Sequence, residues 1–349
     1  KNFTSKLNVE THNFNAIGSL ATGGLSNIWG GGLSKFAEHE YHSNSSDHAE
    51  IDKIYEKVQR EMQLAIENDA VTKTNQIYDK RLKRLFGENR NKISFNSPVN
   101  ALNERNAGDQ KVNNHGIFNA NTLINKLKKN KNFRVISDSF INKLRKHELN
   151  YVLETSNKLS ERGEKYLLKN VFFCLGVIST TKLILELEQA FDIAIPLKTT
   201  PLGYFLIFTS KKRQNDTAFG ISGLSYNFNN HDDLISGGIF PCNIEILSYY
   251  KYLNCLPKFL KLLIDKILLQ RMFIGNVFFS SSMSSNQIKI FENGKCFIEG
   301  KNHKSLKKNF KKIKKSLNIS LKGFNMRILP GIGKLAVPGS DVHYSGTLP

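Results

Sequence analysis

A glycine-rich stretch near the start of the sequence has the composition of a loop that binds a large group through its backbone. Residues 20–34 read LATGGLSNIWGGGLS and place five glycines around Trp29, the single tryptophan of the chain. Glycine allows close approaches that a Cβ would block, and successive N–H groups in such a stretch can form a concave anion site. Ser26 and Asn27 add side chains that can hydrogen-bond a ligand. The same composition also suits a glycine-rich surface loop with a partly buried tryptophan.

A histidine in the last motif of the sequence is the candidate acid–base group. Residues 338–349 read PGSDVHYSGTLP and contain His343. The ordinary pKa of histidine lies close to neutral pH, so an imidazole can accept or donate a proton in catalysis. A lone histidine more often has a structural role, so this assignment depends on the motifs elsewhere in the chain.

A third motif predicts a buried strand that passes directly into a helix. Residues 171–187 read VFFCLGVISTTKLILEL, an apolar run followed by Gly176 and then by a segment with helical periodicity. This order is typical of a parallel strand that leads into its crossover helix. The alternative interpretation is ordinary sheet core without a ligand.

Taken together, the three motifs resemble those of the glucose-methanol-choline (GMC) family of flavin oxidoreductases, in the order the family has them. The resemblance covers about residues 17–35, 115–190 and 300–349. It implies FAD-dependent oxidation of an alcohol or sugar hydroxyl, in which His343 is the base and flavin N5 takes the hydride. The substrate would be a small molecule, and the electron acceptor stays open. The resemblance also implies that the following residues contact the cofactor: Gly23, Gly24, Ser26, Asn27, Trp29, Gly30, Gly31, Phe140 and Gly176.

The sequence departs from the family pattern at several points. Ile28 stands where some relatives have a histidine bonded to the flavin, so the resemblance implies that FAD is bound non-covalently. Leu175 is bulkier than the residue usual before the glycine of the third motif. The family's N-terminal phosphate loop and the second residue of its active-site pair have no match here. The resemblance therefore implies a fragment, with the loop upstream of it and the second residue downstream.

The expected fold is α/β (α+β overall), with a Rossmann-like FAD-binding domain split in sequence. Residues 1–200 would form this incomplete FAD-binding domain, with a helical insertion at about 47–130. Residues 201–330 would form a substrate-binding domain with an antiparallel sheet and helices, and residues 331–349 would return to the FAD domain and the active site. The expected elements are helices from residue 49 and over 120–130, 177–189, 259–270 and 306–321, and strands around Val135, Val152 and Val171 and within 201–299.

Composition leaves a second class of function open. The chain has 50 Lys and Arg against 30 Asp and Glu, a formal net charge of +20. No nucleic-acid reading motif accompanies this charge, so we expect no nucleic-acid partner. The alternative function is a non-catalytic basic protein, or a decayed GMC relative, that binds polyanions through lysines 307–315. The helix that carries them could lie on a membrane, although a solvated outer face is more common. The apolar runs predict no membrane span, and the sequence has no visible signal peptide, so a cytoplasmic location is expected.

Three further patterns carry no function in this interpretation. GIGKLA at residues 331–336 matches a dinucleotide fingerprint, but Pro338 would break the helix that the fingerprint needs. The cluster HEYHSNSSDH at 39–48 has no spacing that suits a metal site, so no metal is expected. The four cysteines show no paired spacing and are expected to be free, buried thiols.

Overall fold

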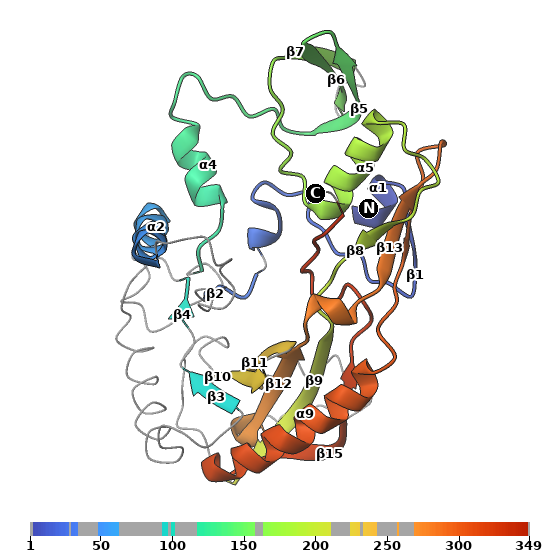
Figure 1. The fold of residues 1–349 in the computed structure, drawn as a ribbon. Helices are drawn as coiled ribbons and strands as arrows, with labels where there is room; N and C mark the ends of the chain where they lie inside the picture. The colour runs from blue at the N-terminus through green and yellow to red at the C-terminus, as the bar shows by residue number, and fades with distance from the viewer. Residues whose placement is uncertain are drawn as a thin grey trace.

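The fold is mixed α/β, with several sheets and few helices. The structure, a computed structural model, describes residues 3–27, 29–33, 48–62, 93–96, 99–101, 117–157, 163–210, 224–230, 233–242, 257 and 269–347. Figure 1 shows a six-stranded sheet at one end, a three-stranded sheet at the other, and a four-stranded sheet beside helix α5 (Val177–Leu187) between them. Helices α2 (His48–Glu61) and α4 (Asn121–Leu127) lie on the other side of the molecule from the four-stranded sheet (Figure 1). All three helices fall where the sequence predicts them.

The largest sheet is antiparallel throughout and carries the main core. Helix α9 (Leu306–Leu321) packs on it, because Leu306, Phe310, Ile313 and Leu317 recur at helical spacing and are buried together. Each such side chain contributes about 1.5–3 kcal/mol when it is fully buried. In sheet order the strands are β15 (Met326–Leu335), β9 (Leu202–Thr209), β12 (Met272–Phe278), β11 (Asp233–Pro241), β10 (Leu224–Asn230) and β3 (Ile93–Asn96).

The antiparallel sheet and the helix at 306–321 are both present as predicted. The sheet also includes residues outside the expected range of 201–330. Strand β3 comes from the range expected as a helical insertion, and β15 continues to Leu335. Strand β15 runs through the GIGKLA pattern, so that pattern is part of a sheet and does not open a helix, as predicted. Short 3₁₀ helices accompany the sheet: η6 (Leu269–Arg271), η7 (Ser281–Met283) and η8 (Lys322–Phe324).

The hairpin at residues 286–299 belongs to a different sheet from the one expected. It turns at Asn293 and Gly294, where Gly294 has a φ of +75°, and it pairs with the beginning of the chain. Its buried side chains, among them Ile288 and Ile298, pack with α5 and Phe14 in a core separate from that of the larger sheet. In sheet order the strands are β1 (Val9–His12), β14 (Cys296–Glu299), β13 (Asn286–Ile290) and β8 (Ile195–Leu197), with β1 parallel to β14.

The strand predicted around Val135 is confirmed only from Ser139 onward, and the strand predicted around Val171 only up to Leu168, whereas the one around Val152 is confirmed. Residues 134–138 and 170–175 make no backbone–backbone hydrogen bond with any part of the chain that is described. A strand requires a neighbouring strand for its N–H and C=O groups, and neither segment has one. The nearby sheet is an antiparallel meander of β5 (Ser139–His147), β6 (Asn150–Asn157) and β7 (Gly163–Leu168).

The remaining elements are short. They are α1 (Phe3–Lys6), η1 (Gly24–Asn27) and a two-stranded sheet of β2 (Gly32–Leu33) and β4 (Val99–Asn100). The helix expected at 259–270 lies almost wholly outside the described residues, as does the cluster expected at 39–48. Within the described part of the chain, no helix is long and apolar enough to cross a membrane.

Candidate functional site

The segment that carries His343 is held by residues from the beginning of the chain. The hydroxyl of Tyr344 accepts a hydrogen bond from the Ile17 N–H at 2.9 Å, and it lies 2.9 Å from Gly339 O and 3.1 Å from Asn15 O, to which it can donate. Burial raises the pKa of Tyr344 to about 12, so this hydroxyl stays protonated and keeps its donor. The chain then runs from Ile17 into the glycine-rich loop (Figure 1). The motif that contains His343 and the glycine-rich motif are thereby joined.

The turn that precedes His343 requires glycine at position 339. Gly339 has a φ of +83°, in the left-handed region. A Cβ there would lie 2.6 Å from the Phe14 ring and 2.7 Å from Asn15 O. The approach is this close because Asn15 N donates to Pro338 O at 2.8 Å, which brings the two segments together.

A buried carboxylate holds the backbone of the histidine. Asp341 has a side chain that is only 2% exposed, and its Oδ2 accepts hydrogen bonds from Thr200 N at 2.9 Å and His343 N at 3.2 Å. Burial raises the pKa of Asp341 above its ordinary value, and the two accepted hydrogen bonds oppose that shift. Between the two residues, Val342 has a φ of +60°. A left-handed conformation is unfavourable for a β-branched residue, so the surrounding contacts impose it.

The imidazole of His343 is free to meet a ligand. Its side chain is 63% exposed, its Nδ1 lies 3.8 Å from Asp341 Oδ2, and its ring lies 5.6 Å from the ring of Phe278 at the end of β12. When protonated, the imidazole is within ion-pair distance of Asp341. The arrangement therefore provides an accessible group that can bind and release a proton beside an apolar ring.

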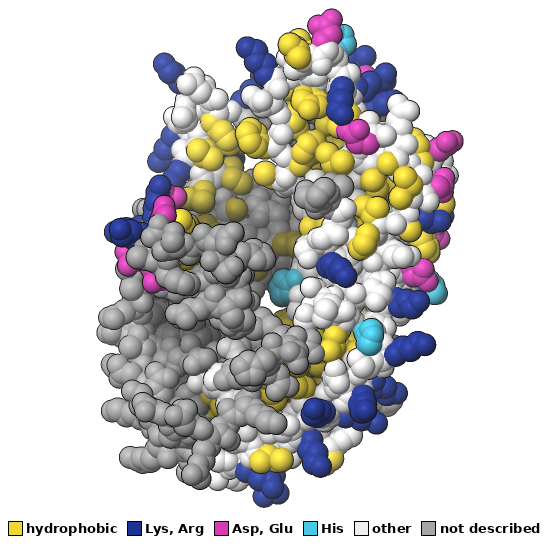
Figure 2. All heavy atoms as spheres, viewed as in Figure 1, with side chains coloured by type: hydrophobic (Ala, Val, Ile, Leu, Met, Phe, Trp, Pro, Cys, Tyr) yellow, Lys and Arg dark blue, Asp and Glu magenta, His cyan; other side chains and the backbone are white. Residues whose placement is uncertain are grey.

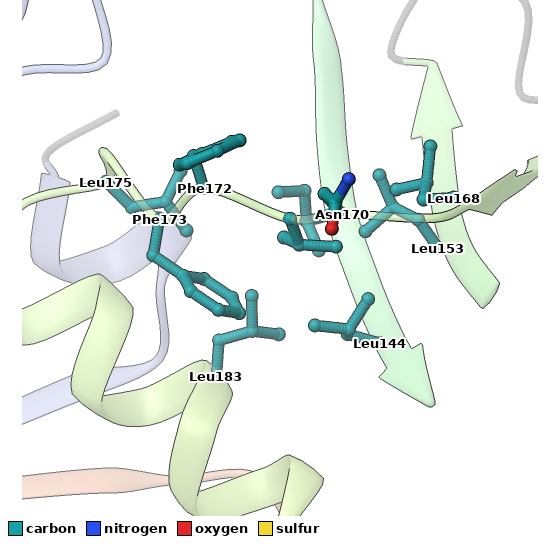
Figure 3. Close-up of a pocket in the computed structure, with 10 residues that line it drawn as sticks. Leu144, Leu153, Leu168, Asn170, Phe172, Phe173, Leu175 and Leu183 are labelled. Atoms are coloured by element: carbon teal, nitrogen blue, oxygen red, sulfur yellow. The ribbon is translucent and has the colours of Figure 1, made fainter. Parts of the chain in front are cut away.

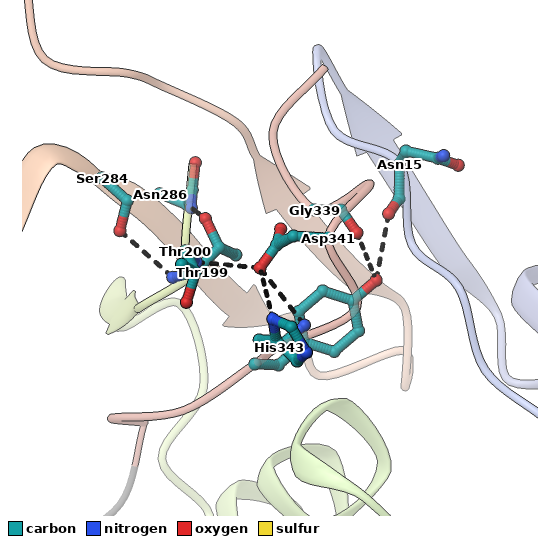
Figure 4. Close-up of polar contacts among 9 residues, drawn as sticks. Asn15, Thr199, Thr200, Ser284, Asn286, Gly339, Asp341 and His343 are labelled. Carbon is teal, nitrogen blue, oxygen red and sulfur yellow. Dashed lines mark hydrogen bonds and ion pairs between the residues drawn. The ribbon is translucent and has the colours of Figure 1, made fainter. Parts of the chain in front are cut away.

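A second polar cluster holds residues 197–200, the segment between β8 and β9 whose Thr200 N–H donates to Asp341 (Figure 4). The amide nitrogen of buried Asn286 donates to Leu197 O at 3.2 Å and to Thr199 Oγ1 at 3.0 Å, while Asn286 Oδ1 accepts from Lys301 N at 2.8 Å. Thr199 N donates to Ser284 Oγ at 3.1 Å. Because the donors of Asn286 are satisfied inside the protein, this cluster serves to hold residues 197–200 in place.

The side chains predicted to contact a flavin from the glycine-rich loop are hydrogen-bonded to the protein itself. Trp29 Nε1 donates to Phe118 O at 2.6 Å, and both hydrogens of the Asn27 amide are directed at backbone oxygens of the same loop. Ser26 Oγ donates to Gly23 O and accepts from Ala120 N. These contacts tie the loop to residues 117–121, and they leave its backbone as the part able to bind a ligand.

The backbone of the predicted glycines differs from position to position. Gly23, Gly24, Gly31 and Gly176 all have positive φ values, from +58° to +88°. A Cβ at Gly31 would lie 2.8 Å from Ile117, so packing inside the protein explains that glycine. A Cβ at Gly24 or Gly176 would meet nothing within 4 Å, so the space beside these two backbones is open. The N–H of exposed Gly30 donates to no described residue.

The last two predicted contacts lie near α5 and β5. Gly176 is the residue before α5, and within that helix Thr181 Oγ1 donates to Thr347 Oγ1 at 2.6 Å. The third motif therefore touches the end of the His343 segment. Phe140 lies in β5, where Lys6 Nζ is 5.3 Å from the centre of its ring.

An apolar pocket of about 250 Å³ lies beside α5 (Figure 3). Its walls come from β5, β6, β7, α5 and residues 170–175, and they include Leu144, Leu153, Phe173 and Leu183. Among the described residues that line it, Asn170 contributes the single polar side chain, and none of them carries a group suited to proton transfer. Phe172 at its mouth is 89% exposed, which is the opposite of the buried strand predicted there.

Sequence reasoning singled out His343 as the candidate base but missed the residues that hold its backbone. Asp341, Tyr344 and Gly339 stand in the same motif, and that proximity was the available signal. Their partners at residues 14–17 and at Thr200 have no local signal in the sequence. The described residues contain no group of three or more side chains that could hold a metal ion. Cys174, Cys242 and Cys296 are thiols, as predicted, although Cys174 is exposed and not buried; Cys255 lies outside the described residues.

Comparison with known proteins adds no relative. No protein-family model matches the chain, and no curated protein matches its sequence at a significant level.

Proposed function

We propose that the chain is an FAD-dependent oxidoreductase of the GMC type that oxidises a CH–OH group of a small alcohol or sugar, with His343 as the base. The observation that carries the proposal is the turn before the histidine. The buried carboxylate of Asp341 accepts a hydrogen bond from the backbone N–H of His343, whose imidazole is exposed. Val342, between these two residues, is held in a left-handed backbone conformation. Strained backbone that surrounding contacts impose is concentrated at functional sites.

The glycines support a flavin contact through backbone and not through side chains. The open space beside Gly24 and Gly176 is where a cofactor could approach the chain without meeting a side chain. Gly176 opens α5, and N–H groups at a helix N-terminus favour a phosphate. Asn27 and Trp29 have already used their side-chain donors, so their part in the site is to hold the loop. FAD would be bound non-covalently, in the Rossmann-like domain that the resemblance implies.

In this mechanism His343 hydrogen-bonds the substrate hydroxyl and accepts its proton. Because Nδ1 faces Asp341, Nε2 is the ring nitrogen that meets the substrate. Removal of the hydroxyl proton makes the C–H bond a better hydride donor, and bound FAD supplies the hydride acceptor. The imidazolium that forms lies within ion-pair distance of Asp341, which positions it through its backbone and opposes its positive charge.

The test is flavin reduction in the protein expressed from its full open reading frame. Anaerobic stopped-flow absorbance would follow the flavin after mixing with a panel of alcohols and sugars. His343→Ala should slow reduction by roughly 10²–10⁴-fold while the flavin content per mole of polypeptide is unchanged.

The matched control is His147→Ala, which removes an exposed histidine at the end of β5, in a different sheet from the strands around the site. This variant should reduce its flavin at the wild-type rate. An unchanged rate in His343→Ala would refute the assignment of the base, and a folded wild-type protein that binds no FAD would refute the assignment of the cofactor.

A further inference from the structure

Helix α9 presents a dense row of lysines on its outer face. Lys307, Lys308, Lys311, Lys312 and Lys315 are all exposed, and we call these five the lysine face. At about 100° per residue they fall within one side of the helix. Figure 2 shows dark blue side chains gathered on the part of the surface where α9 lies in Figure 1.

The opposite side of α9 is not available to a partner. Leu306, Phe310, Ile313, Leu317 and Leu321 are at most 6% exposed and belong to the main core. The helix therefore cannot bury its apolar side in a lipid bilayer, as a free amphipathic helix would. Any partner that binds α9 therefore contacts its exposed lysine side chains.

Within the described part of the chain, the charge of the lysine face is uncompensated, unlike that of the other long helices. In α2, Lys57 and Arg60 pair with glutamates one turn away, and in α5 Lys182 pairs with Glu186. Helix α9 contains no acidic residue, and no lysine of its face is paired with any acidic side chain that the structure describes. Like charges on one face repel, so this arrangement becomes favourable when anions cover it.

We propose that the lysine face docks the protein, by electrostatic attraction, on an anionic lipid surface. Four to eight basic residues on one side of an amphipathic helix are typical of contact with anionic headgroups. The face offers only ammonium groups, without the arginines or exposed aromatic rings that bind nucleic-acid phosphates and bases in a fixed geometry. Ile319, which is 61% exposed on the same side of the helix, adds an apolar contact at the headgroup level.

The test is vesicle flotation with the whole chain. Protein is mixed with phosphatidylcholine vesicles, with or without about a third phosphatidylserine, and centrifuged in a density gradient so that lipid-bound protein rises and aggregates sink. Protein should float with the anionic vesicles alone. Binding should be lost when salt is raised from about 0.1 M to 1 M, because the screening length falls from about 10 Å to 3 Å.

Replacing the five lysines of the face with glutamine should weaken binding by roughly 10³-fold, since each lysine near an anionic leaflet contributes about fivefold. The control replaces five other exposed lysines: Lys128, Lys129, Lys131, Lys143 and Lys169. This control carries the same net charge and should keep its binding, and circular dichroism checks that both variants are folded. The proposal is overturned if anionic vesicles do not bind, if both variants lose binding equally, or if the lysine face is needed only for binding of duplex DNA in a parallel anisotropy titration.

Discussion

Replacing Asp341 tests how the candidate base is held in place. Asp341→Ala would leave the N–H groups of Thr200 and His343 without their acceptor. A fully buried donor without a partner costs about 1–3 kcal/mol; both of these hydrogen bonds are only partly buried, so about 2–6 kcal/mol is the upper range for the two. Removal of a carboxylate whose burial is unfavourable offsets part of that loss. We expect a net destabilisation of about 2–4 kcal/mol.

Asp341→Asn separates the charge from the hydrogen bonds, because the amide oxygen can still accept from both N–H groups. The pKa of Asp341 is raised by burial, so the folded protein holds this proton more tightly than the unfolded chain does. The resulting stabilisation is complete below the ordinary carboxyl pKa of 3.8 and is lost as pH rises through the raised value. The amide of asparagine does not titrate in this range, so the Asp341→Asn variant does not lose stability in this way. The stability of Asp341→Asn relative to wild type should therefore increase from about pH 4 to pH 7.

Urea unfolding followed by far-UV circular dichroism would measure both effects, with the free energy of unfolding compared at each pH. The structural reasoning would be refuted by an Asp341→Ala variant as stable as wild type. It would equally be refuted if Asp341→Asn lost stability relative to wild type as the pH rises.

Three further substitutions test other parts of the structure. Gly24→Ala should lower the flavin absorbance per mole of the full-length protein while costing only about 1–2 kcal/mol of stability for its left-handed φ; full occupancy would mean that no cofactor approaches this backbone. Gly339→Ala should destabilise the protein by about 2–5 kcal/mol in thermal unfolding, through left-handed strain plus the clash with Phe14 and Asn15. The chain of residues 1–349 should bind a hydrophobic dye and self-associate through its exposed apolar surface, and Phe172→Ser should reduce both dye fluorescence and light scattering. Equal values for Phe172→Ser and wild type would place the self-association elsewhere.

Local patterns in the sequence were sufficient for much of the secondary structure. The apolar stripe of α9, the turn at Gly294 and the alternating strands around residues 202–299 are short-range periodicities, and the structure has helices, a hairpin and antiparallel strands there. Such patterns predict an element because they state which side of it is apolar. His343 was singled out differently, by the resemblance of a short motif, and its role as the base stays a prediction.

Tertiary structure decided what these elements pack against and how the candidate base is held. The apolar run at Val171 has the composition of a buried strand, but a strand exists only where another strand satisfies its backbone, and no described strand hydrogen-bonds to this run. Likewise, Tyr344 meets Ile17 across 327 positions of the chain, and Asp341 meets Thr200 across 141. A hydrogen bond between such distant residues depends on the path of the whole backbone and leaves no periodicity in the sequence, so only the folded chain shows it.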